Sequence, residues 1–320
     1  TRDVAKLVNE LDDAGVDGLV IDLRGNGGGS LREANELTGL FIEYGPTVQI
    51  RGTGSRVWRD GKRRRGPYYD GPVAIMIDRL SASASEIFAG ALQDYGRAIV
   101  VGDRSFGKGT VQTLLDLPEG QLKITESKFY RISGDSTQHR GVIPDISYPS
   151  LLQHDEIGES SLDKALDWDR IAPVRHKDYG VVDAILPTLV AKHTERANSD
   201  PDFQYIWDQK ALSEKVRGAE LLPLNEAERI AQRTSQEIQY LAIENTRRQA
   251  KGMNALASLD DLVDGDDDSS DMPQDNAEEP SATSEDTEAG EVDALITETA
   301  RILADAINLS GPVMARADSR

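Results

Sequence analysis

The sequence contains no cysteine and only four histidines, at positions 139, 154, 176 and 193. A chain without cysteine has no disulfide framework, no thiolate nucleophile and no cysteine-based zinc site. No two of the histidines stand four residues apart, which is the spacing that places two metal ligands on one helix face. We therefore expect neither a metal nor any other cofactor.

Aromatic residues make up only 5% of the 320 residues and apolar residues 38%, so part of the chain is not expected to join a core. The net charge of −20 locates that part, because 15 acidic residues lie at 260–293 and no lysine or arginine lies at 252–300. We predict an acidic disordered linker at 259–290 and a terminal helix at 291–312 that docks back. The charge left elsewhere is small and gives no support to nucleic-acid binding.

Long apolar runs are also missing. No run approaches the roughly 20 consecutive apolar residues that a transmembrane helix needs, so we expect no integral membrane segment. No charged-then-apolar leader stands at the amino end, and a helical pattern follows Thr1 directly. We expect this chain to be a piece of a longer precursor whose signal peptide lies outside it.

Apolar strands alternate with amphipathic helices over the first 150 residues. This alternation is typical of an α/β layer with a largely parallel sheet. The strands are predicted at 18–23, 73–78 and 98–102, and the helices at 4–11, 31–44 and 85–95. Two antiparallel strands are predicted at 110–117 and 121–132, and the core is expected to close near 141–147. A helical domain is predicted at 151–258, with helices at 162–168, 179–196, 203–216 and 225–251.

The sequence SASASE at 81–86 precedes an apolar helix. Ser83 and Glu86 fit a capping box, in which a hydroxyl and a carboxylate satisfy free backbone N–H groups at a helix start. The same position also suits a nucleophile, because the unpaired N–H groups and the positive end of the helix dipole favour developing negative charge. The sequence leaves both interpretations open.

A nucleophilic serine needs a base, and histidine is nearly absent from the α/β part of the chain. Lysine is the remaining candidate. An ordinary lysine has a pKa near 10.4, so a lysine that acts as a base near neutrality needs a pKa lower by roughly 3 and therefore apolar surroundings. Lys108 fits on sequence, because it follows the apolar strand at 98–102 and stands next to Phe106 and two glycines.

Lys108 also ends a near match to the phosphate-binding loop. The sequence GDRSFGK at 102–108 matches seven positions of GxxxxGK[ST], but Gly109 replaces the hydroxyl residue that would hold magnesium. The segment after it is rich in β-forming residues, whereas a phosphate loop opens a helix. Nucleotide hydrolysis is therefore the weaker hypothesis for this segment.

A glycine-rich turn, GNGGGS, occupies residues 25–30. Adjacent glycines allow a sharp turn with positive φ angles. They also allow another molecule's backbone to approach closely and meet unpaired N–H groups that can bind an oxyanion. The turn by itself favours neither role.

In combination, these segments resemble the carboxy-terminal processing peptidases, the tail-specific serine proteases of family S41. The resemblance is specific over about residues 1–150 and weaker through the helical region, where 200–203 are similar to the bacterial periplasmic branch. It rests on four segments in matching order and spacing: DLRGNGGGSL at 22–31, DRLSASASEIFAGALQDYGRA at 78–98, VVGDRSFGKGTVQ at 100–112 and QHRGVIPDI at 138–146.

The resemblance implies a catalytic dyad of Ser83 as nucleophile and Lys108 as general base. It further implies that Gln112 orients Lys108 by a hydrogen bond and that Asp94 matters for activity, for which we expect a structural role. The oxyanion hole is implied at the backbone N–H of Gly28 or Gly29 together with that of Ala84. The fold implied is a crotonase-like, ClpP-related α/β protease core with an antiparallel β extension, followed by an α-helical region.

The function implied is endoproteolysis of proteins with apolar carboxy-terminal tails in the bacterial periplasm, aided in some family members by a lipoprotein adaptor. An inactive peptide-binding scaffold of the same fold is the alternative. Family members also carry a peptide-binding PDZ module before these segments, and this chain starts too late to contain it. Seven basic residues at 51–65 predict either a solvated hairpin or loop, or a docking site for an acidic partner such as the chain's own linker.

Overall fold

The computed structural model describes residues 1–54, 56–218, 221–263 and 293–310. The chain forms two compact units. Unit 1 comprises Thr1–Tyr148, Leu152–His193 and Thr297–Arg320, and unit 2 comprises Pro149–Leu151 and Thr194–Ile296. Unit 1 therefore takes in residues after 148 in addition to the predicted core at 1–150. Most of the predicted acidic linker lies outside the described residues, although 260–263 within it are helical.

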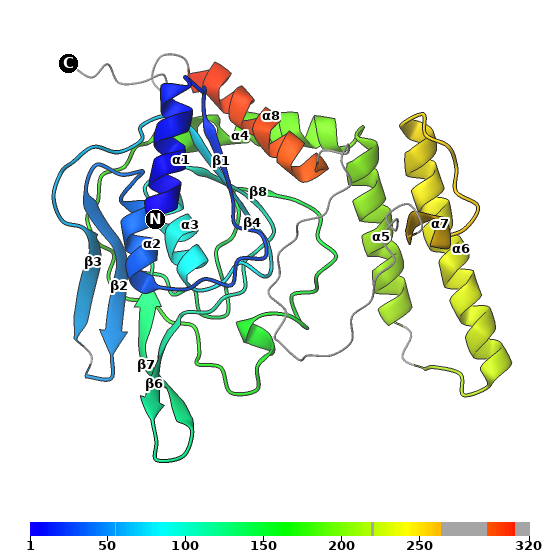
Figure 1. The fold of residues 1–320 in the computed structure, drawn as a ribbon, viewed down its shortest axis with the longest axis horizontal. Helices are drawn as coiled ribbons and strands as arrows, with labels where there is room; N and C mark the ends of the chain where they lie inside the picture. The colour runs from blue at the N-terminus through cyan, green and yellow to red at the C-terminus, as the bar shows by residue number, and fades with distance from the viewer. Residues whose placement is uncertain (55, 219–220, 264–292, 311–320) are drawn as a thin grey trace, which may run out of the picture. The chain divides into compact units, whose positions relative to one another are not determined.

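A four-stranded parallel sheet forms the centre of unit 1, with the order β1-β4-β5-β8 (Figure 1). Every residue of β4 and β5 is buried, as expected for parallel strands covered on both faces. The apolar runs thus predicted these strands correctly. The strands are β1 (Leu19–Asp22), β4 (Val73–Ile77), β5 (Ile99–Gly102) and β8 (Ile146–Ser147).

A second, antiparallel sheet has the order β3-β2-β7-β6. The hairpin of β6 and β7 confirms the predicted antiparallel pair. β2 and β3 make a second hairpin, whose turn and second strand lie in the basic segment at 51–65. β6 and β3 are the two edge strands. The strands are β2 (Gly45–Gly52), β3 (Val57–Lys62), β6 (Thr110–Asp116) and β7 (Gln121–Tyr130).

Three helices of unit 1 follow the predicted pattern: α1 (Arg2–Asp13), α2 (Leu31–Thr38) and α3 (Ala84–Asp94). The helix predicted at 31–44 is too long, because α2 ends at Thr38. Phe41 and Ile42 are both fully buried, and adjacent residues on a helix point about 100° apart, so leaving the helix allows both side chains to enter the core. Phe41 stacks edge-on against Phe88 of α3, at 5.8 Å between ring centroids.

The later part of the chain is helical, as predicted, but the helix predicted at 162–168 is wrong. Only a 3-10 turn at Glu159–Ser161 precedes this segment. Residues 165–169 form neither helix nor strand. Trp168 donates to the carbonyl oxygen of Ser136, and Asp169 pairs with Arg51 and Lys128 of the antiparallel sheet. The remaining helices are α4 (Val181–Ala197), α5 (Pro201–Arg217), α6 (Glu226–Ala250), α7 (Asp260–Val263) and α8 (Ala294–Ser310).

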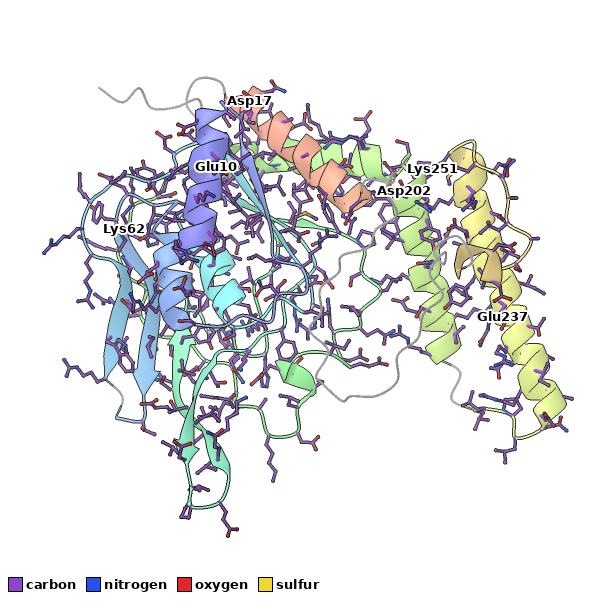
Figure 2. All side chains as sticks on the ribbon, viewed as in Figure 1. Glu10, Asp17, Lys62, Asp202, Glu237 and Lys251 are labelled. Atoms are coloured by element: carbon purple, nitrogen blue, oxygen red, sulfur yellow. The ribbon has the colours of Figure 1, made fainter. Side chains whose placement is uncertain are left out.

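Within unit 2, α5 and α6 pack together through Asp202. This side chain pairs with Arg247 at 2.5 Å. It also pairs with Lys251 at 3.1 Å, and Figure 2 labels Asp202 and Lys251. These two cations hold the pKa of Asp202 below its usual value, against the opposing effect of burial. Asp202 lies in the first turn of α5, whose N-cap Asp200 accepts from the backbone N–H groups of Asp202 and Phe203.

The predicted terminal helix is α8, and it packs into unit 1. Leu303 lies against Gly18, just before β1, where a Cβ atom on the glycine would come within 3.0 Å of the leucine side chain. His193 of α4 contacts Glu298 at 3.0 Å, and Lys192 pairs with Asp305 at 2.6 Å. Among the helices that the structure describes, none has the length and apolar character needed to cross a membrane.

Candidate active site

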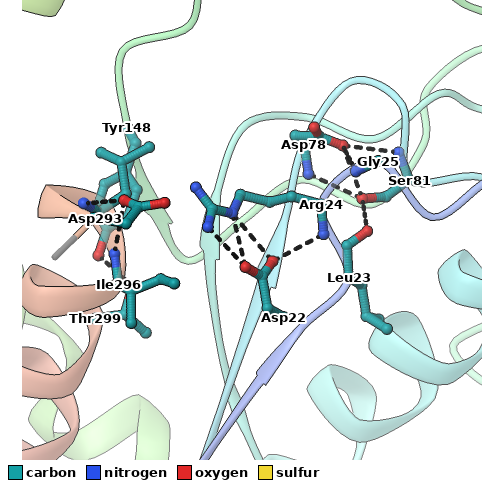
Figure 3. A network of polar contacts seen from close by, with 11 residues as sticks. Asp22, Leu23, Arg24, Gly25, Asp78, Ser81, Tyr148, Asp293, Ile296 and Thr299 are labelled. Atoms are coloured by element: carbon teal, nitrogen blue, oxygen red, sulfur yellow. Dashed lines mark hydrogen bonds and ion pairs between the residues drawn. The ribbon is translucent and has the colours of Figure 1, made fainter. Parts of the chain in front are cut away.

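The glycine-rich turn after β1 is fixed to the loop after β4 (Figure 3). One carboxylate oxygen of Asp78 accepts hydrogen bonds from the backbone N–H groups of Gly25 and Ser81, both at 3.0 Å. The hydroxyl of Ser81, in the loop after β4, donates to the carbonyl oxygen of Leu23, directly after β1, at 2.7 Å. Because β1 and β4 are parallel neighbours, both loops leave the same edge of the sheet, and these bonds hold them together.

Asn26 continues this connection toward the start of α3. Its carbonyl oxygen accepts from the backbone N–H of Ala82 and from the Ser85 hydroxyl, both at 3.0 Å. Its side-chain oxygen accepts from the Ser85 hydroxyl at 2.9 Å and from the backbone N–H of Gly28 at 3.0 Å. The N–H of Gly28, one of the predicted oxyanion donors, is therefore already engaged by a protein acceptor.

Gly28 lies directly against the residues around Ser83. It has a φ of +93°, and a Cβ atom there would come within 2.5 Å of the Ala82 carbonyl oxygen and 2.7 Å of the Ala84 nitrogen. Only glycine fits both this backbone conformation and this approach. By contrast, a Cβ atom on Gly29 would meet nothing within 4 Å. Gly29 lines the pocket that contains Ser83, and so does Ala84.

Ser83 is the N-cap residue of α3 and has a strained backbone, with φ 57° and ψ −109°. Apart from His139 it is the only non-glycine residue with positive φ among the described residues. Such conformations cost about 1–3 kcal/mol and collect at functional sites, where the surrounding structure enforces them. The Ser83 side chain lies at the positive end of the helix dipole, as the sequence predicted.

Glu86 connects the start of α3 to the loop that carries Lys108. This fully buried carboxylate accepts from the backbone N–H groups of Ser83 at 2.7 Å, Gly107 at 2.7 Å and Lys108 at 3.0 Å, and from the Ser105 hydroxyl at 2.6 Å. Burial raises the pKa of Glu86 to about 7, and the four hydrogen bonds oppose that rise. The capping-box pattern indicated the bond to Ser83 but carried no signal for the bonds to 105–108.

Ser83, Lys108 and Gln112 line one pocket of about 270 Å³. Lys108 is partly buried. No hydrogen bond joins its side chain to Ser83 or to Gln112 in the portion of the chain that is described, so the bond implied between Gln112 and Lys108 is not formed here. The other lining residues are Gly29, Leu31, Ala84, Ile87, Thr110, Val111, Lys123 and Phe129.

Asp94 lies at the opposite end of α3 from Ser83, about 16 Å away at 1.5 Å per residue. Its carboxylate pairs with Arg131 at 2.5 Å, and its other oxygen accepts from the backbone N–H of Ser133 at 3.3 Å. Asp94 does not line the pocket. It connects the end of α3 to the chain that follows β7.

The segment around Lys108 does not open a helix, because β6 begins at Thr110. It therefore lacks the helix start at which a phosphate loop binds its ligand. Within the described residues, no three His, Asp or Glu side chains come together as metal ligands would.

Within the described part of the basic segment, three of the seven basic side chains have structural partners. Arg51 pairs with Asp169, and Arg65 pairs with Glu43 at 3.2 Å. The Lys62 ammonium lies within hydrogen-bond distance of four backbone carbonyl oxygens, among them that of Gly39 at the end of α2. Burial lowers the pKa of Lys62. Four arginines of this segment, at 56, 59, 63 and 64, are exposed, as the predicted solvated hairpin would have them.

Comparison with known proteins connects this arrangement to proteolysis. Residues 1–148 match the model of peptidase family S41, and residues 152–308 match the model of the C-terminal domain of tail specific protease. The chain is 39% identical over 274 residues to the tail-specific protease of Haemophilus influenzae, an alignment that covers 82% of this chain and 39% of that protein.

Two further comparisons cover the first part of the chain. The carboxy-terminal processing protease of Bacillus subtilis is 39% identical over 155 residues, which is 46% of this chain and 31% of that protein. The solved structure of the photosystem II D1 C-terminal processing protease is 32% identical and covers 49% of this chain and 42% of its own, with a TM-score of 0.41. This chain spans less than half the length of each of these relatives.

Proposed function

Since residues 1–148 belong to peptidase family S41 and residues 152–308 to the tail-specific protease C-terminal domain family, we propose that this chain carries the catalytic part of a serine endopeptidase. One observation carries the proposal. Ser83, held in a strained conformation at the amino end of α3, shares its pocket with Lys108 and with no histidine. A serine and a lysine are sufficient for acyl transfer when the lysine is a neutral amine.

In the proposed reaction, the Lys108 amine takes the proton of the Ser83 hydroxyl while the Ser83 oxygen bonds to the substrate carbonyl carbon. The carbon–nitrogen bond of the peptide then breaks, and the Lys108 ammonium gives its proton to the leaving amine. In the second half, Lys108 takes a proton from water as the water oxygen bonds to the acyl carbon. The bond between the acyl carbon and the Ser83 oxygen then breaks, and the Lys108 ammonium returns the proton to the Ser83 oxygen. Gln112, which lines the same pocket, orients Lys108 when substrate is bound.

The negative charge on the carbonyl oxygen is assigned to the backbone N–H groups of Gly29 and Ala84. Both residues line the pocket, and Ala84 is the first residue of α3, where backbone N–H groups have no partner within the helix. Gly28 has a different role, because its N–H donates to Asn26 and its missing side chain allows the turn to approach Ser83. Two such donors typically contribute several kcal/mol to transition-state stabilisation.

The substrates proposed are proteins with apolar carboxy-terminal tails. Leu31, Ile87, Val111 and Phe129 give the pocket an apolar lining. β6 borders the pocket and is an edge strand, so an extended peptide can add to it by main-chain hydrogen bonds. The resemblance to tail-specific proteases also supports a bacterial periplasmic location and a lipoprotein adaptor as proposals for the whole protein.

The decisive experiment compares the chain with its Ser83→Ala, Lys108→Ala and Lys108→Arg variants on an unfolded protein that ends in an apolar tail. All three variants should lose at least about 1,000-fold in kcat/KM. Lys108→Arg is the informative one, because arginine keeps the positive charge but cannot act as a base. Circular dichroism checks that each variant is folded, and the same substrate with a polar tail tests the tail preference.

Two results would contradict the proposal. Full activity of Lys108→Arg would exclude Lys108 as the base. If the wild-type chain binds the apolar tail without cleaving it, and Ser83→Ala binds it equally well, the chain is a peptide-binding scaffold of the same fold.

A further inference from the structure

A second lysine, Lys123 of β7, lines the same pocket as Ser83 and Lys108. Lys123 has no role in the proposed reaction. It stands opposite Leu114 in the β6–β7 hairpin and is exposed, so its ammonium is available to a ligand. Across the described residues, its side chain has no hydrogen bond and no ion pair.

The pocket and the hairpin offer Lys123 no acidic partner. No aspartate or glutamate is among the residues that line the pocket. Two acids of the hairpin are engaged elsewhere, because Glu126 accepts from the Thr113 hydroxyl at 2.7 Å and Asp116 accepts from Gln121 at 2.8 Å. The hairpin does carry Asp116, Glu119 and Glu126, but within the described residues none of them forms an ion pair with the Lys123 ammonium, which leaves it open to an acidic group of a substrate.

Apolar side chains make up most of the remaining wall. Leu31 comes from α2, Ile87 from α3, Val111 from β6 and Phe129 from β7. At about 270 Å³ the pocket is smaller than a typical site of about 300–1,000 Å³ for a drug-sized ligand, so it suits one substrate side chain with adjoining backbone. Walls of low polarity strengthen the attraction between an ammonium and a carboxylate, and a charged donor strengthens the hydrogen bond between them.

We propose that Lys123 determines specificity by binding a carboxylate of the substrate, while the substrate's adjacent apolar side chain occupies the pocket. The inference rests on the proposed function, because it assumes that peptides are cleaved at Ser83. A peptide can supply the carboxylate from an aspartate or glutamate side chain next to the apolar residue, or from its free carboxy terminus. Either group would pair with the same ammonium.

The test uses four fluorogenic peptides that share one apolar residue at the cleavage position. They combine glutamate or glutamine beside that residue with a free or an amidated carboxy terminus. Each is measured at low salt with the wild-type chain and with Lys123→Gln, Lys123→Arg and Lys123→Glu. Lys164→Gln is the matched control, because Lys164 is also exposed but does not line the pocket.

We expect the wild-type chain to favour one carboxylate over its neutral counterpart by about 5-fold in kcat/KM, as for a partly exposed ion pair. Lys123→Gln should abolish the preference, Lys123→Arg and Lys164→Gln should retain it, and Lys123→Glu should reverse it. Raised salt should weaken it. A preference that follows glutamate identifies a side-chain carboxylate, and one that follows the free terminus identifies the terminal carboxylate. These ratios would not change if Lys123 were only structural.

Equal kcat/KM for all four peptides in the wild-type chain would overturn the proposal, and so would a preference that survives in Lys123→Gln. If no peptide is cleaved, the proposed function fails instead. The same four peptides, fluorescently labelled, then measure the preference as binding affinity to the Ser83→Ala variant. Equal affinities there would overturn the assignment of Lys123.

Discussion

The backbone N–H groups of Ser83 and Lys108 donate to the same carboxylate oxygen, Oε2 of Glu86, at 2.7 and 3.0 Å. The two residues proposed for catalysis are 25 positions apart in the sequence, and this shared acceptor fixes their backbones relative to each other. The other oxygen of Glu86 accepts from Ser105 and Gly107, so the whole loop before β6 is held at the start of α3. A buried acceptor with four donors is costly to disturb.

Glu86 predicts a dependence of stability on pH. Burial raises its pKa in the folded protein from 4.5 to about 7, so between these values the folded state retains a proton that the unfolded chain has lost. Protonated Glu86 therefore contributes on the order of 3 kcal/mol to the free energy of unfolding. This contribution is complete below about pH 4.5 and is lost as the pH rises to about 7. The free energy of unfolding, measured by urea denaturation between pH 4.5 and 7, should fall with pH in the wild-type chain and not in Glu86→Gln. If it depends on pH in the same way in both chains, the prediction is wrong.

Gly28 and Gly27 form a matched pair in the glycine-rich turn. Gly28→Ala places a Cβ atom against Ala82 and Ala84 at a φ of +93°, whereas Gly27→Ala meets nothing within 4 Å. We expect Gly28→Ala to lower kcat/KM by about 100-fold or more, because it displaces the proposed oxyanion donors. The kcat/KM of Gly27→Ala should stay within about 2-fold of the wild-type value, because the added methyl group leaves the geometry of the site unchanged. Similar losses in the two variants would show that the close approach of Gly28 does not matter.

The ion pair between Asp94 and Arg131 predicts a stabilising role for Asp94. Both side chains are largely buried, at 9% and 16% exposure, so Asp94→Leu or Arg131→Met alone leaves an unpaired charge and costs about 3–5 kcal/mol. The double variant should be less destabilised than the sum of the two, by about 1–3 kcal/mol. Thermal unfolding and kcat are measured on all three. A folded double variant without activity would show that Asp94 contributes more than this pairing.

Leu303 of α8 is 5% exposed and lies against Gly18, whereas Leu309 near the end of the same helix is 41% exposed. Leu303→Ala should lower the free energy of unfolding by about 2–4 kcal/mol, because it leaves a cavity. Leu309→Ala is the control and should change it by less than about 1 kcal/mol. Equal effects would mean that α8 is not part of the core of unit 1.

The sequence predicts well where a local pattern decides the structure. The buried strands β4 and β5 and the start of α3 at Ala84 are marked by apolar runs and by a capping box. The segment at 162–168 misleads, because its helical spacing competes with contacts to residues more than 30 positions earlier in the chain. Lys128 donates to the carbonyl oxygen of Asp167 and pairs with the neighbouring Asp169, and Trp168 donates to the carbonyl oxygen of Ser136.

The same limit applies within the candidate site. Ser83 and Lys108 can be selected by their local sequence and by resemblance. Asn26 and Asp78 lie in segments that carry the resemblance, but the sequence does not indicate what they do. They join loops that are about 50 to 60 residues apart, and only the folded structure brings those loops together. The sequence does not reveal that Lys123 lines the pocket for the same reason, since its neighbours in sequence are ordinary residues of an exposed hairpin.

The contact between Gly18 and Leu303 joins residues 285 positions apart. Ser83, Lys108 and both sheets all precede α8 in the sequence, yet an apolar face of α8 covers this side of unit 1. Detachment of α8 alone would therefore expose apolar surface of unit 1 to water and lower its stability. A local opening far from Ser83 in the sequence thus becomes a route by which the candidate site can be lost.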